Sequence, residues 1–387
     1  MRGAAKPDKR RQNDLNQQIS IDRIPANQLS PADWQEWRQL NDVLGGHPGL
    51  DSDFVSGIVS IFGNNDVMSV RVRRGSRPVL WLLAQRRGYG IYDAFTPPQA
   101  PYDPVLADLG DHDVEDICQT IRALPGPAMS LRLLRQRAEA PFIRTLIRSP
   151  LQLVNKRGPT TRVRIEGTFE NYWSHRTRPR KQIDRQLKKL EREGILPQLV
   201  EHSEPRAVEA ALVEYARLEN AGWKGRNCSA IDINAPSGRF YRQLLSTFAS
   251  QKAARVYQLY FSGELVASQL AVERGGTLAL LKTAYDERFS SYGPGRLLDY
   301  FLLHKLHHER PGAVIDFCNA AQPDELRWAT DVHSLTSITL FRTPAIRLFA
   351  TMIRSARKAL KAPIAIGLGA QGVQTAAFLN DLVMQLG

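Results

Sequence analysis

The sequence predicts a mixed α/β (α+β) fold built from two similar units, each a mixed, mainly antiparallel sheet flanked by helices. At 387 residues the chain is longer than one core usually encloses, so two domains are the default. Strand-like and helix-like segments alternate in both halves, which are similar in length and element types although no strict sequence repeat links them. With 43% hydrophobic and 24% charged residues, the chain is globular and can bury two cores.

The first half follows a polar, basic stretch, residues 1–18, that we expect to be disordered. Ser30 is an N-cap residue followed by proline, which predicts a helix from this point. Alternating and buried apolar runs predict strands, and a longer periodic run predicts another helix. The expected strands cover residues 67–74, 78–85 and 129–134, and the second helix covers residues 111–124. The first unit therefore spans residues 19–165.

The second unit spans residues 166–343, and a helical segment, residues 344–387, follows it. A very basic helix, residues 178–193, has Pro179 in its first turn and Gly194 just past its end. Short glycine-containing turns separate three strands and predict an antiparallel meander. The expected strands cover residues 196–200, 255–261, 265–273, 277–285, 313–318 and 337–341, and the expected helices cover residues 204–222 and 237–252.

The net charge of +13 and the pI of about 9.8 favour anionic partners: CoA-type phosphates, nucleotide-linked sugars, nucleic acid or an acidic membrane face. Cys118, Cys228 and Cys318 are too few and too widely spaced for a disulfide framework or a zinc ribbon, which indicates a reducing compartment. The basic N-terminus lacks an apolar signal segment, and no run reaches the roughly 18 apolar residues of a membrane span. We therefore expect a cytoplasmic protein.

The most informative segment is the Gly-Pro-Gly turn at residues 293–295, between a strand and a long helix. Gly293 and Gly295 let backbone N–H groups approach an anion, and the helix directs its positive dipole end at the same point. Arg288 and Arg296 flank the turn and can add contacts to a pyrophosphate. The turn is therefore either a phosphate cradle or only a glycine-rich connection.

Three further clusters have both a structural and a functional interpretation. The basic helix is either a solvated face or an anion-facing one; no zinc-finger, helix-turn-helix or RNA-binding aromatic signature supports nucleic acid. Glu219, Trp223 and Lys224 near a helix end either line a substrate pocket or divide between core and solvent. The C-terminal helix from residue 345 either packs on the second domain, which we favour, or rests on an anionic membrane.

Strand alternation places Gln269 on one strand and groups Leu278, Leu280 and Lys282 on one face of the next. Lys282 on this apolar face either reaches a substrate carboxylate or extends to the sheet edge. Asp316, in an otherwise apolar strand, is the better candidate for a working carboxylate, because an unpaired buried charge is costly.

Two motifs are discounted. The glycine spacing at residues 367–372 matches a dinucleotide-binding turn, but the chain ends too soon afterwards to complete that unit, so a bend between helices is expected. His304 and His308 lie one helical turn apart, but no third ligand accompanies them, so no metal is expected.

Five segments of the second half, taken together, resemble the acyltransferase domain of the CelD/BcsL group, a branch of the GNAT (Gcn5-related N-acetyltransferase) superfamily. The resemblance covers about residues 169–342. The segments are the basic residues 176–194, Glu-Asn-Ala-Gly-Trp-Lys-Gly at 219–225, Gly-Glu-Leu-Val-Ala at 263–267, Lys-Thr-Ala-Tyr-Asp-Glu-Arg-Phe at 282–289 and Gly-Pro-Gly-Arg-Leu-Leu at 293–298.

The resemblance implies acetyl-CoA or another acyl-CoA as co-substrate and transfer of the acyl group to an amine, often in making envelope polysaccharide. Related FemABX-type proteins pair two GNAT-like units, as the two halves here would. The implied CoA-binding residues are Thr283, Arg288, Gly293, Gly295 and Arg296. The sequence departs from the family pattern at residues 324–325, where Asp-Glu replaces a Tyr-Lys pair, and this puts the acceptor in doubt.

Acyl transfer to an amine needs a group that removes the amine proton and a donor that stabilises the oxyanion. We expect Asp316 or Glu219 to accept the proton, and a backbone N–H near Thr283 to Tyr285 to face the thioester carbonyl. The expected substrate-binding residues are Trp223, Lys224, Gln269 and Lys282.

Three functions remain open. The leading prediction is an acyl-CoA-dependent N-acyltransferase whose acceptor is an amine, such as a nucleotide- or lipid-linked amino sugar, with peripheral contact to the inner face of the membrane as a possibility. The second is a FemABX-like transferase that takes an aminoacyl group from tRNA. The third is a non-catalytic GNAT-like binding protein.

Overall fold

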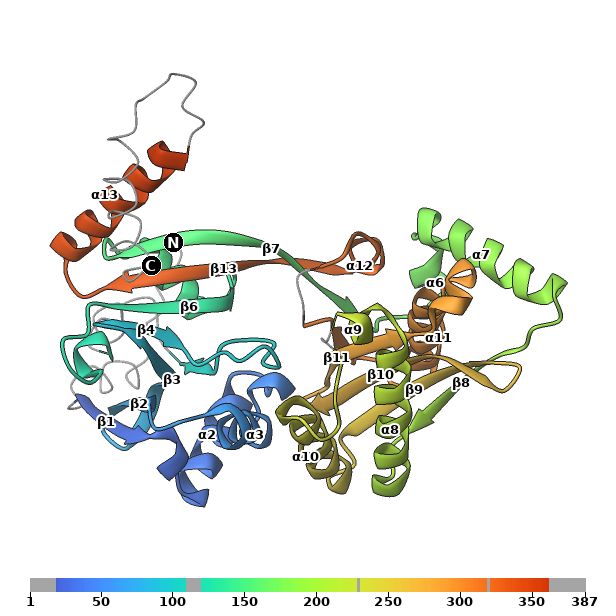
Figure 1. Cartoon of the computed structure of the whole chain (residues 1–387), viewed down its shortest axis with the longest axis horizontal. Coiled ribbons are helices and arrows are strands. Elements are labelled where there is room, and N and C mark those ends of the chain that lie inside the picture. The colour runs from blue at the N-terminus through green and yellow to red at the C-terminus, as the bar shows by residue number, and fades with distance from the viewer. Residues whose placement is uncertain (1–18, 109–119, 228–229, 319–320, 362–387) are drawn as a thin grey trace, which may run out of the picture.

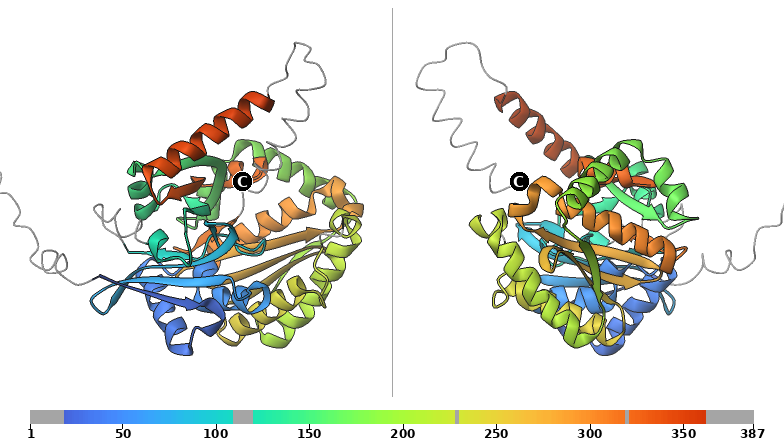
Figure 2. Two further views of the ribbon diagram at one scale, coloured as in Figure 1. Left: turned by 60° about the vertical axis from the view of Figure 1, so that its left-hand side comes forward. Right: turned by 90° about the vertical axis from the view of Figure 1, so that its right-hand side faces the viewer.

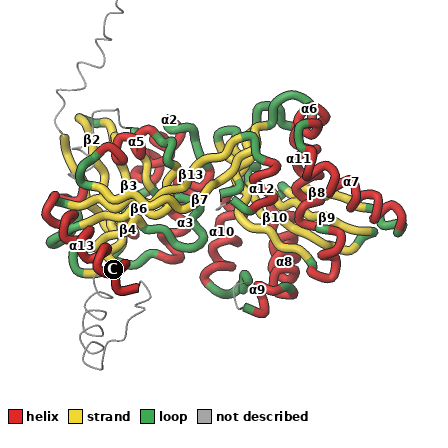
Figure 3. Tube along the Cα trace, turned by 90° about the horizontal axis from the view of Figure 1, so that it is seen from above, coloured by secondary structure: helices red, strands yellow, loops and turns green. Residues whose placement is uncertain are grey.

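The computed structural model describes residues 19–108, 120–227, 230–318 and 321–361, and within them 13 strands form one continuous sheet (Figures 1 and 3). The strand order is β1-β2-β3-β4-β6-β13-β7-β12-β11-β10-β9-β8, with β5 beside β3. The strands are β1 (Ile19–Pro25), β2 (Val67–Arg74), β3 (Arg77–Gly88), β4 (Ile91–Ala94), β5 (Val105–Ala107), β6 (Ser130–Arg137), β7 (Gln152–Arg164), β8 (Pro197–His202), β9 (Ala254–Phe261), β10 (Glu264–Arg274), β11 (Thr277–Tyr285), β12 (Val314–Asp316) and β13 (Asp331–Phe341).

The two halves repeat one order of elements: a strand, two main helices (with the short α9 between them in the second half), three antiparallel strands, and then a strand parallel to the last of them. In the first half β4 pairs parallel with β6, and in the second half β11 pairs parallel with β12. This repetition confirms the predicted mixed α/β class with two similar units. The helices are α2 (Pro31–Val43), α3 (Ser52–Phe62), α5 (Pro141–Arg148), α6 (Phe169–Ser174), α7 (Thr177–Arg192), α8 (Pro205–Ala221), α9 (Trp223–Arg226), α10 (Pro236–Ser250), α11 (Pro294–Glu309), α12 (Pro323–Trp328) and α13 (Pro344–Lys361).

The halves exchange their last strands. β7 ends the first half but pairs antiparallel with β12 of the second, and β13 ends the second half but pairs with β6 of the first. β7 and β13 also pair with each other along most of their length, so these two strands bridge the halves (Figure 1). The predicted boundaries of the two units stay predictions, because both halves share this sheet.

One apolar core runs under both halves. Helices α2 and α3 of the first half and α8 and α10 of the second cover the same face of the sheet (Figure 2). The rings of Phe54 on α3 and Phe240 on α10 meet edge-to-face with centroids 5.5 Å apart. Since burial of aromatic side chains is a large part of folding free energy, this contact joins the halves into one cooperative unit.

On the opposite face each half has its own core. Helices α6, α7 and α11 cover the second half, and residues such as Ile121, Phe142 and Leu146 cover the first. No helix among the described residues is long and apolar enough to cross a bilayer.

Local signals predicted several elements correctly. Ser30 caps α2 in a reciprocal capping box with Asp33. Helix α7 has Pro179 in its first turn and is followed by Gly194 at φ 67°. The meander β9-β10-β11 and the helix after the Gly-Pro-Gly turn also form as predicted.

Other elements had no assignment, among them α3, α5, β1, β4, β5, β7, α9 and α12, and β13 begins six residues before the expected strand. The predicted disordered tail and the bend at residues 367–372 lie outside the described residues, as does most of the helix expected at residues 111–124.

Candidate functional site

Strands β11 and β12 pair only briefly and then part. Their parallel pairing ends where Ala279 faces Asp316, so the rest of β11, to Tyr285, has no partner on β12. Just beyond this point β11 carries a bulge: Leu270 of β10 faces Lys282 and Ala271 faces Leu280, which leaves residue 281 without a partner. Bulges bend a strand and disrupt its ladder, and they are common next to active sites. The parting strands therefore leave the backbone groups at the end of β11 without a partner on β12.

Helix α11 begins beside the end of this strand. Gly293 has φ 63° and φ values of this sign suit glycine, while Pro294 takes the first helical position, as predicted. A side chain at Gly295 would meet only Tyr285 Cδ1, at 3.8 Å, so its surface is open. At Gly293 the amide of Gln186, from α7, already occupies that space. The open part of the helix start is therefore its second residue.

The two arginines expected beside this turn have other partners. Arg288 is exposed and donates to Asp286 at 2.6 Å and to Glu264 at 2.6 Å. Arg296 donates to Asp324 on α12 at 3.2 Å. Both arginines are therefore paired with carboxylates in this structure, and their role as phosphate ligands stays a prediction.

Five of the predicted residues meet at the end of β11. They line a cavity of about 130 Å³ between this strand and the end of α8. Trp223 is 48% exposed at its edge. The lining residues are Glu219, Gly222, Trp223, Lys224, Thr283, Ala284 and Tyr285.

Glu219 is the buried centre of a polar network on this cavity. Its carboxylate accepts from Lys224 Nζ at 2.8 Å and Lys282 Nζ at 3.1 Å. It also accepts from the Tyr215 hydroxyl at 3.0 Å and the Ile231 N–H at 2.8 Å. Burial alone would raise the pKa of Glu219, but these lysines and hydrogen bonds hold it below its usual value. The surroundings of Glu219 therefore do not favour the expected role of this carboxylate as acceptor of the amine proton.

Lys282 lies on the opposite face of β11 from the one that alternation predicted. Leu278 and Leu280 belong to the core beneath α11, whereas Lys282 reaches Glu219 on α8. The bulge at residue 281 causes the difference, because one extra residue reverses the side that the following side chains take. Burial lowers the pKa of Lys282, although the nearby carboxylate acts in the other direction.

Gln269 lies on the sheet face that carries Leu278 and Leu280, which is the face that alternation predicted for Lys282. Its neighbours on that face, Ala267 and Ala271, belong to the core under α11. Its Nε2 donates to Thr283 Oγ1 at 3.0 Å, and its buried Oε1 has no hydrogen-bond partner among the described residues. The predicted substrate residues are thus divided between the two faces of the sheet, and Gln269 retains an unused acceptor.

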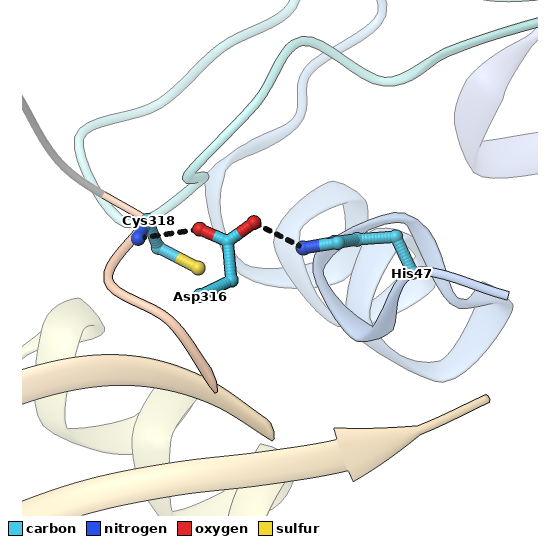
Figure 4. Close-up of side chains that lie close together, drawn as sticks. All are labelled: His47, Asp316 and Cys318. Carbon is cyan, nitrogen blue, oxygen red and sulfur yellow. Dashed lines mark hydrogen bonds and ion pairs between the residues drawn. The ribbon is translucent and has the colours of Figure 1, made fainter. Parts of the chain in front are cut away.

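Asp316 is fully buried where the halves meet (Figure 4). Arg162 on β7 donates to it at 2.7 Å, and the Tyr102 hydroxyl at 3.0 Å. The Cys318 N–H and His47 Nε2 complete its shell, at 2.8 and 3.3 Å. Burial would raise the pKa of Asp316, but the His47 hydrogen bond and the Arg162 charge hold it well below its usual value. As proton acceptor Asp316 is therefore a poor candidate, because the predicted unpaired charge is fully paired.

His47, Asp316 and Cys318 also offer atoms within 4.8 Å of one another that could in principle hold a metal ion. The arrangement does not suit a cation. His47 Nδ1 accepts from the Gly49 N–H at 3.0 Å, so Nε2 carries the proton that points at Asp316. Burial raises the pKa of the Cys318 thiol, and Arg162 already neutralises the carboxylate.

Sequence reasoning missed His47, Tyr102 and Arg162, because they lie far apart in the chain and no spacing links them to Asp316. It also missed Asp299 on α11. Burial, with added repulsion from Glu325 and Asp324 on α12, raises the pKa of Asp299 to about 8. Its position in a largely apolar helix directly after the Gly-Pro-Gly turn was the available clue.

Residues 177–334 match the family model described as the acetyltransferase (GNAT) domain. The chain contains a GNAT-type acetyltransferase domain. It holds the bulged strand, the helix start and the cavity described above. No curated protein sequence matches the chain.

Several solved structures are also similar to the chain. The C-terminal domain of a protein assigned as a lysylphosphatidylglycerol synthetase from Agrobacterium fabrum superposes with a TM-score of 0.50 at 12% identity, covering 83% of this chain and 95% of that one. FemX gives 0.46 at 10% identity (81% and 92%), and a tandem GNAT protein of clavulanic acid biosynthesis gives 0.45 at 13% (84% and 99%). At 12% identity the first match indicates a shared fold only.

Proposed function

We propose that this GNAT-type transferase is an acyl-CoA-dependent N-acyltransferase. The observation that carries the proposal is the parting of β11 from β12 beside the open start of α11. It sets an unpaired strand edge next to a helix N-terminus, which is the combination that a ligand with both amide and phosphate groups requires. The CelD/BcsL-like segments of the sequence point to the same reaction.

In the proposed reaction the acceptor nitrogen attacks the thioester carbon, the carbon–sulfur bond breaks, and an amide and free CoA result. Backbone N–H groups of β11 near Thr283 to Tyr285 stabilise the oxyanion, because they point from an edge that no neighbouring strand uses. Gly295, which has open space above its Cα, holds the pyrophosphate. Acetyl-CoA is the proposed donor, as the resemblance to GNAT acetyltransferases implies.

The amine must lose a proton, and Glu219 is the only carboxylate among the described residues that line the cavity. Because its pKa is lowered, it stays ionised and paired. We propose that Glu219 positions Lys224 and Lys282, and that water carries the proton away.

The proposed acceptor is an amino sugar of an envelope or extracellular polysaccharide precursor, linked to a nucleotide or a lipid. Trp223 supports this class, since an exposed indole at the cavity edge provides a flat apolar surface on which a sugar ring can pack.

A second candidate, transfer of an aminoacyl group from tRNA, is favoured by the exposed face of α7. Five cations recur along it at alternating spacings of three and four residues, so they form one stripe. At the start of α11 the Gln186 amide fills the space beside Gly293, and Arg288 is paired with Glu264, so less space and less positive charge are available there for CoA. The stripe consists of Arg178, Lys181, Arg185, Lys188 and Arg192.

Thermal unfolding with acetyl-CoA, longer acyl-CoAs and free CoA tests the donor. A ligand at 100 times its dissociation constant stabilises by about 2.7 kcal/mol, which gives a measurable rise in Tm. Gly295→Asp should abolish the rise: a carboxylate in the first helical turn repels the pyrophosphate while the helix dipole tolerates it. Gly295→Ala is the matched control and should keep most of the rise, since its methyl group meets only Tyr285.

If no CoA compound raises the Tm, the proposal fails. Product formation from aminoacyl-tRNA that ribonuclease abolishes would then establish the second candidate. Absence of both would leave a GNAT-like binding protein.

A further inference from the structure

Helix α13 continues from the end of β13 and lies against the outer ends of β7 and β13, away from the second half (Figures 1 and 2). Two arginines of α13 donate hydrogen bonds to β7. Arg347 Nε donates to the Gln152 carbonyl at 3.0 Å, and Arg354 Nη2 to Asn155 Oδ1 at 2.6 Å.

Three large apolar side chains of α13 face the other way, whereas Ile346 and Ile353 are partly buried. Leu348, Phe349 and Met352 are 64%, 61% and 62% exposed, and their spacing places them on one side of the helix. Arg347 and Arg354, seven residues apart, lie on the side that contacts the sheet. A surface helix normally buries its apolar stripe and exposes its polar face. Here three large apolar side chains point to solvent, and the helix contacts β13, which belongs to the predicted second unit, as well as β7 of the first.

The sequence around this face is strongly basic. From residue 342 to residue 380 it contains no aspartate or glutamate. A basic helix whose apolar stripe no described residue covers has the chemistry that the interface of an anionic bilayer complements. The cations of this segment are Arg342, Arg347, Arg354, Arg357, Lys358 and Lys361.

We propose that α13 docks the protein on anionic lipid bilayers, with Leu348, Phe349 and Met352 inserted at the level of the headgroups. The helix lies in the plane of the interface, and the Arg347 and Arg354 contacts fix its apolar side outward before the membrane is met. The proposal does not depend on the reaction that the transferase domain performs.

Flotation of the full chain with vesicles tests the proposal. We expect the protein to float with vesicles that contain phosphatidylglycerol, to stay behind with pure phosphatidylcholine vesicles, and to bind less tightly as salt rises. Leu348→Gln with Phe349→Gln should weaken binding at least about tenfold, because two large apolar side chains are lost from the contact. The matched control is Leu196→Gln with Val213→Gln, which removes two exposed apolar side chains elsewhere and should bind like wild type.

Other outcomes overturn the proposal. Wild-type protein that never floats does so directly. So does flotation that Lys181→Glu with Arg185→Glu abolishes while the α13 variant retains it, since α7 would then be the docking surface. A third outcome would assign the apolar face to a second copy of the chain. In that case light scattering shows that the wild type is a dimer and that the Leu348→Gln, Phe349→Gln variant is a monomer, and neither protein binds vesicles.

Discussion

His47 donates its Nε2–H to the carboxylate of Asp316, 269 residues further along the chain, at 3.3 Å. Asp316 stands at the last pair of the β11–β12 ladder, where the strands of the GNAT-type domain part. Arg162 reaches the same carboxylate from β7, one of the two exchanged strands. The hydrogen bonds of one buried carboxylate therefore hold the first half, the exchanged strand and the point where the site opens in fixed relation.

We expect Asp316→Asn to destabilise the fold by about 3 to 5 kcal/mol, because it leaves the Arg162 charge buried without its partner. Urea unfolding at neutral pH measures the loss. The control is Asp331→Asn, which removes a similar pair with Arg164 that lies at the surface and should cost less than about 1 kcal/mol. Equal losses in the two variants would show that the buried network contributes nothing special.

The sequence predicted those elements that local signals define, such as α2 with its Ser30 cap and the turn at Gly293. It could not predict the side of Lys282, because alternation counts residues and a bulge at residue 281 changes the count. Nor could it pair Asp316 with His47 or Arg162, since long-range contacts leave no trace in spacing. Burial of a charge was recognised correctly from sequence; whether it was paired required the fold.

Gly293→Ala should destabilise the protein by about 1 to 2 kcal/mol, since its φ of 63° is unfavourable for a residue with a side chain. The methyl group would also displace the Gln186 amide from the start of α11. Gly295→Ala, two residues later, has ordinary helical geometry and open space and should cause no loss. The midpoints of denaturant unfolding of the two variants measure this difference. Equal midpoints would contradict the requirement for glycine at the positive φ of residue 293.

Glu219→Gln should lower kcat/KM about tenfold or more but leave the shape of the pH–rate profile unchanged, provided that the proposed acyl transfer is confirmed. The reason is that Glu219 is held ionised by Lys224 and Lys282 and orders them, and so does not itself take up the proton. Rates measured from pH 5 to pH 9 with a fixed amine, over the range that general-base catalysis would affect, test this. If the variant loses the acidic limb of the profile, Glu219 is the general base after all.

Asp299→Asn should stabilise the protein at alkaline pH and much less so at acidic pH. The pKa of Asp299 is about 8 in the fold and about 3.9 for an unperturbed aspartate, so between these values the folded state keeps a proton that the unfolded chain releases. Stability of the wild type therefore falls as pH rises from about 4 to about 8, and this contribution is absent from the neutral variant. Differential scanning calorimetry across this range should show the Tm of Asp299→Asn minus that of wild type increasing with pH. Asp299→Ala, also neutral, should follow the same trend, and a difference that stays constant with pH would show that Asp299 is ionised in the folded protein.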